Sequence, residues 1–220
     1  LEPWSSIDAV VGKIGALRQE CGRDVGIAVD FHGRANHVVA RTLLRELEQF
    51  GLMWVEEPVS PESDDTLRDL RRVAGSVPIA TGERLTSRRQ FKQLLHDGTV
   101  DILQPDVSLT GLFELEKICR MAEAYDVAVA PHCPNGAVSL AASLQVGFCC
   151  ANVVIQEQWG APFDYLTRPE LLRVTDGGFD RLDGPGLGID VDAAAVAAAV
   201  TDWRVPDPTW RHSDGRSAEW

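Results

Sequence analysis

The chain has 220 residues, 45% of them apolar and 25% charged, which is the composition of a globular protein. A formal net charge of −12 argues against a nucleic-acid partner, because such binding requires a basic surface. No apolar run is long enough to span a membrane, so no membrane partner is expected. Five cysteines, an odd number without a CxxC pair, indicate reduced thiols and a cytoplasmic location.

Short apolar runs alternate with segments of helical periodicity through the first 158 residues. The apolar runs predict strands at 25–32, 52–58, 77–83, 100–106, 127–134 and 152–158. The periodic segments predict helices at 5–21, 37–50, 64–75, 87–98, 111–126 and 136–150. Since strands and helices alternate, we expect an α/β fold with a parallel sheet and right-handed crossovers.

Every predicted strand ends on an ionisable residue. In chain order these residues are Asp30, Glu56, Glu83, Asp106, His132 and Glu157. In an open sheet they would be spread along a line, whereas in a βα barrel they converge on one mouth, where such barrels carry their active sites. We therefore predict a barrel. A barrel needs eight strands, so we expect an N-terminal piece of the protein to lie outside this sequence.

After Gln158 the sequence becomes rich in Gly, Pro and Asp, which predicts a loop, a short helix and a hairpin, followed by a helix at 191–200. The GPGLG stretch (184–188) is assigned to turns, because the flanking strand and helix and the lysine of a phosphate loop are missing. We expect a barrel domain at 1–158, with six strand–helix units, and a C-terminal segment at 159–220 that packs on the barrel or a capping domain. Its tryptophan-rich end favours association into a homo-oligomer.

Asp30, Glu56 and Glu83 end three consecutive predicted strands and would meet in the mouth of the barrel. Ionised carboxylates in a water-poor site repel one another unless a cation neutralises them. Carboxylate oxygens prefer a hard ion, so the sequence predicts Mg²⁺ here. The alternative is that each acid is a helix cap or a surface charge. Glu57 follows Glu56 directly and is predicted to face the opposite way, toward a structural partner behind the site.

His132 ends the strand after Asp106, close enough for the carboxylate to orient its ring and raise its basicity. This pairing makes His132 a candidate general base. His32 shares the inward side with Asp30 and could give a proton to a leaving group, or could be a supporting loop histidine. Glu157 could hydrogen-bond a developing oxyanion or substrate hydroxyls. Surface positions are predicted for His37, His96 and His212, and a packing role for Cys133.

Six motifs, in this order and spacing, resemble the enolase superfamily in its mandelate racemase-like branch, and most closely the galactonate dehydratase group of acid-sugar dehydratases. The motifs are VDFHGR, WVEEP, ATGERL, ILQPD, APHCP and IQEQ, and the resemblance extends over nearly the whole chain. It implies a modified (β/α)7β barrel of the TIM type with an N-terminal capping domain. The capping domain and the first two strands of such a barrel are not found in this sequence.

The resemblance implies that Asp30, Glu56 and Glu83 hold Mg²⁺. It implies that His132, paired with Asp106, is the base that removes the proton next to a substrate carboxylate. That proton is barely acidic, because its removal places a second negative charge on the same group. A divalent cation on the carboxylate offsets this charge as it develops.

The resemblance also implies that His32 is the acid that assists loss of the 3-hydroxyl and that Glu157 stabilises the enediolate by a hydrogen bond. Both residues and His132 would contact the substrate, a small-molecule sugar acid, and the product would be a 2-keto-3-deoxy acid. The chain departs from the family in the stretch SLTGLF (108–113), which is one residue shorter than the usual Gly-Gly turn. We expect this difference to shift the geometry of Asp106 and His132 slightly.

Other functions stay open. A racemase or epimerase of a 2-hydroxy acid would use the same site with a base on each face of the substrate, a part that His32 could take. A truncated, non-catalytic barrel would serve only as a structural subunit. A zinc or nickel hydrolase is disfavoured, because such sites rely on several histidines and only His32 and His132 are well placed.

Overall fold

A computed structural model of the chain describes residues 4–61, 63–160, 163–199 and 211. Within them, one parallel sheet has its strands in the same order as the chain. The strands are β1 (Ala28–Asp30), β2 (Trp54–Glu56), β3 (Ile79–Thr81), β4 (Ile102–Leu103) and β5 (Ala128–Val129). An open doubly wound sheet reverses its strand order at a switch point, whereas a barrel wall adds each strand beside the last. The order therefore confirms the predicted barrel-type α/β sheet.

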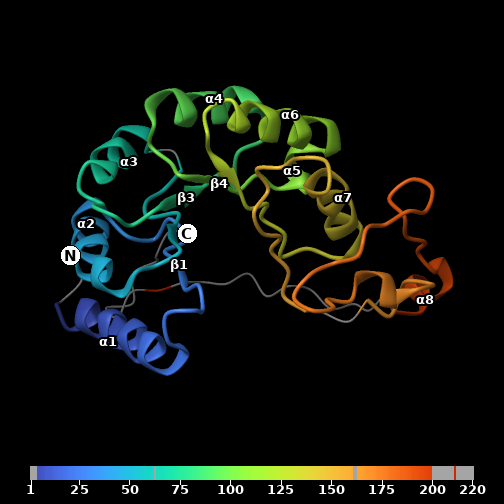
Figure 1. The fold of residues 1–220 in the computed structure, drawn as a ribbon, viewed down its shortest axis with the longest axis horizontal. Helices are drawn as coiled ribbons and strands as arrows, with labels where there is room; N and C mark the ends of the chain where they lie inside the picture. The colour runs from blue at the N-terminus through green and yellow to red at the C-terminus, as the bar shows by residue number, and fades with distance from the viewer. Residues whose placement is uncertain (1–3, 62, 161–162, 200–210, 212–220) are drawn as a thin grey trace.

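Helices cover one face of this sheet. The helices and 3₁₀ turns of the described residues are α1 (Trp4–Cys21), α2 (His37–Leu47), η1 (Glu48–Phe50), α3 (Asp64–Arg71), α4 (Arg88–Asp97), α5 (Val107–Thr110), α6 (Leu112–Glu123), α7 (Ala137–Gly147), η2 (Pro169–Leu172) and α8 (Ala193–Ala199). The last two, η2 and α8, belong to the part of the chain that follows the sheet and do not cover it (Figure 1). Figure 1 shows α2, α3, α4 and α6 following one another along the outer rim of an arc, with the strands on its inner side. The described residues thus form a curved portion of a barrel wall.

The helix ends follow from local capping. Asn36 begins α2 by accepting the backbone N–H groups of Val38 and Val39, both at 3.1 Å from its side-chain oxygen. Ser87 and Gln90 form a capping box at the start of α4. Gly98 ends α4 in the left-handed conformation, with φ of 61°, which glycine adopts without strain.

The last predicted strand, 152–158, is wrong as a regular strand. Within the described residues its pairing is an isolated parallel bridge between Val129 and Val153. Two backbone hydrogen bonds hold it there, from Val129 N–H to the Asn152 carbonyl at 2.8 Å and from Val154 N–H to the Val129 carbonyl at 2.9 Å. Among the residues that the structure describes, the segment lies beside β5 and has no sheet partner on its other side. One bridge with two hydrogen bonds is shorter than a regular strand, so the segment is extended backbone at the edge of the sheet.

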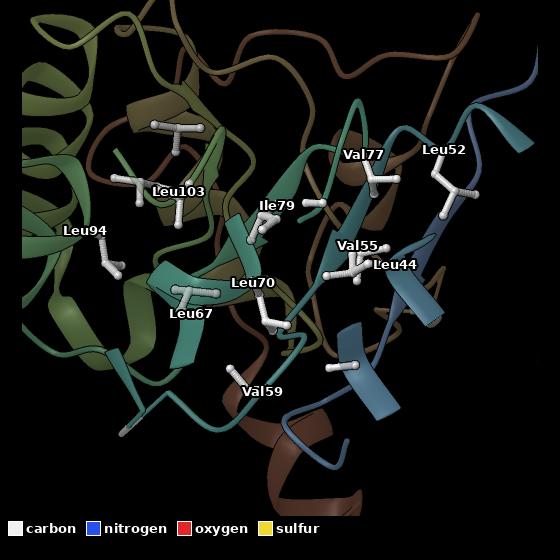
Figure 2. Packing of buried hydrophobic residues seen from close by; sticks show 14 of the residues in the cluster. Leu44, Leu52, Val55, Val59, Leu67, Leu70, Val77, Ile79, Leu94 and Leu103 are labelled. Carbon is white, nitrogen blue, oxygen red and sulfur yellow. The ribbon is translucent and has the colours of Figure 1, made fainter. Parts of the chain in front are cut away.

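The core lies between the sheet and the helices. Every second residue of each strand points outward into this core. Val55, Ile79 and Leu103 are fully buried there against helix residues such as Leu44 and Leu70 (Figure 2). Burial of each large aliphatic side chain contributes about 1.5–3 kcal/mol. This packing fixes which strand residues point outward, and so it also fixes which ones point to the inside of the arc.

The other alternate set forms a smaller cluster on the inner face. Trp54, Ala80, Ile102 and Ala130 make up this cluster. Since side chains alternate along a strand, Glu56 shares the inner face with Trp54. The register pairs the Cα atoms of Glu56 and Asp30. The fold therefore brings both residues to the inner side of the arc at the carboxyl ends of their strands, where Asp30 is exposed and Glu56 is half-buried.

The part that follows the barrel wall packs on α7. Phe163, Leu166, Leu172 and Leu182 share a buried cluster with α7 residues, among them Leu140. An antiparallel bridge between Thr175 and Gly178 marks the predicted hairpin. The tryptophan-rich tail and His212 lie outside the described residues, and the domain division at residue 158 stays a prediction. No helix in the described part of the chain has the length and apolarity needed to cross a membrane.

Candidate active site

The ends of β1 and β2 place two carboxylates next to each other. One oxygen of Asp30 accepts the backbone N–H of His32 at 2.6 Å, and Oε2 of Glu56 accepts the indole N–H of Trp54 at 3.1 Å. Burial raises the pKa of Glu56, and hydrogen bonds from Gln104 and Trp54 oppose that rise. The negative charge of Asp30 raises the pKa further. Removing Glu56 from water beside another acid is thus costly unless a cation is present.

Glu83, at the end of β3, lies between two imidazole rings. Its Oε1 is 3.4 Å from Nε2 of His32, and its Oε2 is 3.6 Å from Nε2 of His132. The carboxylate is 8% exposed, so the three groups meet in a largely buried place. The two histidines predicted as acid and base therefore approach one carboxylate through its two oxygens.

Asp106 and His132 form the pair that the sequence suggests. Nδ1 of His132 lies 2.9 Å from Oδ2 of Asp106, and the other oxygen of Asp106 accepts the N–H of Ser108 at 2.6 Å. Burial alone would raise the pKa of Asp106, but the hydrogen bonds from His132 and Ser108 outweigh it and hold this pKa below its ordinary value. An ionised Asp106 accepts a hydrogen bond from Nδ1–H, so Nε2 of His132 keeps the free electron pair.

The pKa of His132 is raised. Burial acts against its protonated form, but the hydrogen bond to Asp106 and the negative charges of Glu83 and Glu157 outweigh that effect. An imidazole with these neighbours is a stronger base than a free one. The arrangement can therefore take a proton from a nearby carbon acid and hold the resulting positive charge.

Glu157 is tied to the segment that carries His132. Its Oε2 accepts the backbone N–H of Cys133 at 2.6 Å. Gln156 holds the same region, because its side-chain amide donates to the carbonyl of Glu157 at 2.9 Å and its oxygen accepts the hydroxyl of the fully buried Ser143 at 2.6 Å. The sequence did not single out Gln156. Its place next to Glu157 in the IQEQ motif was the available signal.

Glu57 does not face away from the site as predicted. Its backbone adopts φ of 37°, which ends the alternation of an extended strand, and its side chain is fully buried. Neither of its oxygens is placed for a hydrogen bond within the described residues, but Nη2 of Arg84 lies 3.0 Å from Oε2 as an ion pair. Burial and the charge of Glu83 raise the pKa of Glu57 to about 7. Glu57 is therefore partnered, as expected, but close to the site.

The described residues contain a group that could hold a metal ion. Ligand atoms of His32, Glu57 and Glu83 all lie within 4.8 Å of one another, whereas Asp30 and Glu56 are not members of this group. The predicted ligands Asp30 and Glu56 are instead turned to local donors, as described above. Asp30 and Glu56 can offer a metal only carboxylate oxygens, which suit a hard cation.

Asn135, which the sequence did not indicate, also contacts the pair of Asp106 and His132, through Asp106. Its side-chain nitrogen lies 2.9 Å from Oδ2 of Asp106.

All five cysteines are free. Cys133 is 1% exposed and burial raises its pKa to about 11, so it is a packing residue as expected. Of the histidines predicted for the surface, His96 is exposed and His37 is half-buried.

This fold recurs in known proteins. The family model described as "Enolase C-terminal domain-like" matches residues 2–195. A mandelate racemase/muconate lactonizing enzyme from Sulfitobacter sp has a solved structure with a TM-score of 0.85 and 29% identity, covering 90% of this chain and 50% of that one. A mandelate racemase/muconate lactonizing enzyme-like protein from Rubrobacter xylanophilus DSM 9941 has a TM-score of 0.85 and 31% identity, covering 92% and 52%.

Curated relatives are similar along the whole chain. The D-galactonate dehydratase of Variovorax paradoxus (strain S110) is 44% identical over 232 residues, which cover 100% of this chain and 60% of the relative. The D-galactonate dehydratase of Cronobacter sakazakii (strain ATCC BAA-894) is 42% identical, covering 97% and 58%. The chain thus spans about 60% of the length of these relatives.

Proposed function

The chain belongs to the enolase C-terminal domain-like family, and on that premise we propose that the full-length protein is a Mg²⁺-dependent acid-sugar dehydratase. It removes the proton next to the carboxylate of an aldonate such as D-galactonate and expels the 3-hydroxyl as water. The observation that carries the proposal is the position of His132, which is bonded to Asp106 through Nδ1 and directs Nε2 toward Glu83.

Asp30, Glu56 and Glu83 would hold the magnesium ion. Its charge, when bound, offsets the second negative charge that develops on the substrate carboxylate. Arg84 places its positive charge 3.0 Å from Glu57 and 3.5 Å from Glu83. It therefore opposes a cation more strongly at the grouping of His32, Glu57 and Glu83, which contains both acids, than at the all-carboxylate set, which contains only Glu83. Burial, and to a smaller extent the charge of Asp30, raise the pKa of Glu56, and a bound cation would offset both effects, which supports the all-carboxylate set.

His132 serves as the base. The C2–H bond breaks and the proton moves to Nε2, while Nδ1–H keeps its bond to Asp106. The ring then carries a positive charge beside an ionised carboxylate, which stabilises it without a further proton transfer. Glu157 would donate a hydrogen bond to the enediolate if protonated, or accept one from substrate hydroxyls.

His32 serves as the acid. It approaches Glu83 from the oxygen opposite to the one that His132 faces, so it is available to a different part of the substrate. When the C3–O bond breaks, a proton from His32 converts the leaving hydroxide to water. The enol that remains becomes the 2-keto-3-deoxy acid when its O–H proton is lost and C3 gains a proton. His132 ends with one proton more and His32 with one proton fewer, so the pair carries the same number of protons as before.

A racemase or epimerase of a 2-hydroxy acid is the second candidate. The observation that favours it is the same pair of imidazoles, because a base on each side of the substrate could exchange the C2 proton. We also propose a cytoplasmic location, which the free cysteines support. A homo-oligomeric state completes the proposal.

The test is a screen of acid sugars with the full-length protein, depleted of metal and then supplied with Mg²⁺, in deuterated water. The proposal predicts a 2-keto-3-deoxy acid, detected by mass spectrometry, and none after chelation. Deuterium at C2 of recovered substrate without loss of water would instead support the racemase. Neither product from any acid sugar would refute both candidates.

A further inference from the structure

Asp106 accepts more hydrogen bonds than it needs to orient His132. It is 4% exposed, and Ser108 N–H occupies one of its oxygens at 2.6 Å. Its other oxygen, Oδ2, accepts two donors, Nδ1 of His132 and the side-chain nitrogen of Asn135, each at 2.9 Å. A carboxylate oxygen has room for two donors. The oxygen that orients His132 is therefore shared with a neutral amide.

The amide of Asn135 is itself held in place. Its nitrogen also lies 3.1 Å from the hydroxyl oxygen of Ser108, which is 2.7 Å from the hydroxyl oxygen of Ser139. These contacts join the loop before α7 to the short helix α5, which begins directly after Asp106. Asn135 thus spans the two segments that carry the members of the pair, and its donor has a fixed direction.

We propose that Asn135 is a positioning residue that fixes the plane of the Asp106 carboxylate for His132. With only Ser108 and His132 as donors, the Asp106 carboxylate could rotate about its Cβ–Cγ bond and still keep both hydrogen bonds, although in a less linear geometry. A third donor, arriving at Oδ2 from another direction, makes such a turn break a hydrogen bond. The ring of His132 then keeps Nε2 directed at the substrate. The kinetic part of this inference rests on the proposed function.

Asn135→Leu removes the donor while keeping nearly the same side-chain shape. In the full-length protein we expect kcat to fall about tenfold with an almost unchanged KM, because a hydrogen bond to a charged group is lost and no substrate contact is. The kinetic isotope effect on kcat with D-galactonate deuterated at C2 should rise, since proton removal becomes slower. A merely structural loss would reduce the amount of active enzyme and leave the isotope effect unchanged.

Ser139→Ala is the matched control. It removes the far end of the same hydrogen-bond chain but leaves the contact between Asn135 and Asp106, so kcat and the isotope effect should stay at wild-type values. Should the leucine variant fail to fold, Asn135→Ala repeats the test without an apolar side chain at the site. A kcat lowered without a larger isotope effect would overturn the proposal.

A crystal structure of the variant decides the inference independently of turnover. We expect the Asp106 carboxylate to be rotated, or His132 displaced, relative to the wild-type protein. An unchanged pair at 2.9 Å would overturn the positioning role. If the wild-type protein dehydrated no acid sugar, the proposed function would fail, while the two crystal structures would still decide what Asn135 does.

Discussion

Nδ1 of His132 lies 2.9 Å from Oδ2 of Asp106, across the ends of two neighbouring parallel strands. The pair joins a buried, ionised carboxylate to a ring whose pKa is raised. Because the ring must be neutral to accept a proton, activity should be lost as the pH falls through this pKa. The acid limb of kcat/KM should therefore lie above the ordinary imidazole value near 6.5.

Asp106→Asn tests this relationship. Without the carboxylate, burial is left to act against the charged ring, so the pKa of His132 falls and the acid limb of kcat/KM moves to lower pH. We expect kcat to fall by on the order of 100-fold, since the ring is no longer held in the reactive tautomer. The measurement is a pH–rate profile of both proteins, and an acid limb that stays at the wild-type pH would contradict the assignment.

The metal ligands are tested by comparing two adjacent acids. Glu56→Gln should weaken Mg²⁺ binding by more than about tenfold. Loss of a residue that only hydrogen-bonds to a metal ligand already lowers metal affinity by about tenfold or more, and Glu56 is proposed as a ligand itself. Glu57→Gln should bind Mg²⁺ nearly as the wild type does, since Arg84 already neutralises Glu57. Calorimetric titration of the full-length proteins gives both constants. Weakening by Glu57→Gln equal to that by Glu56→Gln would favour the grouping of His32, Glu57 and Glu83 instead.

Arg84→Met leaves the fully buried Glu57 without its counter-charge. We expect the free energy of unfolding to fall by about 3 kcal/mol near pH 8. Arg72→Met, at an exposed ion pair with Asp69, is the control and should cost under about 1 kcal/mol. Equal losses in the two variants, measured by denaturant unfolding, would show that the Glu57 pair contributes no more than a surface pair.

The pH dependence of stability has a definite sign at Glu57. Its folded pKa of about 7 lies above the unfolded value of 4.5, so the folded state binds more protons between these two values. The stabilisation is fully present below pH 4.5 and is lost as the pH rises through about 7. Glu57→Gln should flatten the curve of unfolding free energy across this window in the metal-free protein, whereas a slope equal to that of the wild type would assign the effect to other groups.

Gln156→Leu should destabilise the segment beside β5. It removes the partner of the buried Ser143 hydroxyl, which costs about 1–3 kcal/mol. The exposed Gln49→Leu should change the unfolding free energy by less than about 0.5 kcal/mol. The double variant with Ser143→Ala should recover part of the loss, because no unpaired hydroxyl remains. Additive losses would show that the two side chains are not coupled.

The strand ends were predictable from the sequence because their chemistry repeats with the fold. An apolar run indicates where a strand lies, and the polar residue that ends it indicates which side chain reaches the inner edge. Asp106 and His132 could therefore be paired from the sequence alone. The order of the strands followed for the same reason. The run at 152–158 was indistinguishable from the others in composition, but a ladder also depends on the neighbours that a strand finds.

Contacts made by loops were not predictable. The left-handed turn at Glu57 reverses the direction expected from strand alternation, and no pattern in WVEEP signals a φ of 37° there. Asn135 reaches Asp106 only because the loop before α7 folds back over α5, a contact between residues 29 positions apart. The short helix α5 itself could have been inferred from Asp106, which accepts Ser108 N–H as a helix cap.

The most direct measurement is the time course of 2-keto-3-deoxy acid formation from D-galactonate by the Mg²⁺-loaded full-length protein and its His132→Asn variant. We predict steady product formation by the wild type and a rate lower by on the order of 10³-fold in the variant, with Mg²⁺ binding retained in both. Product formation by the variant at the wild-type rate would contradict the account, because His132 would then not be the base.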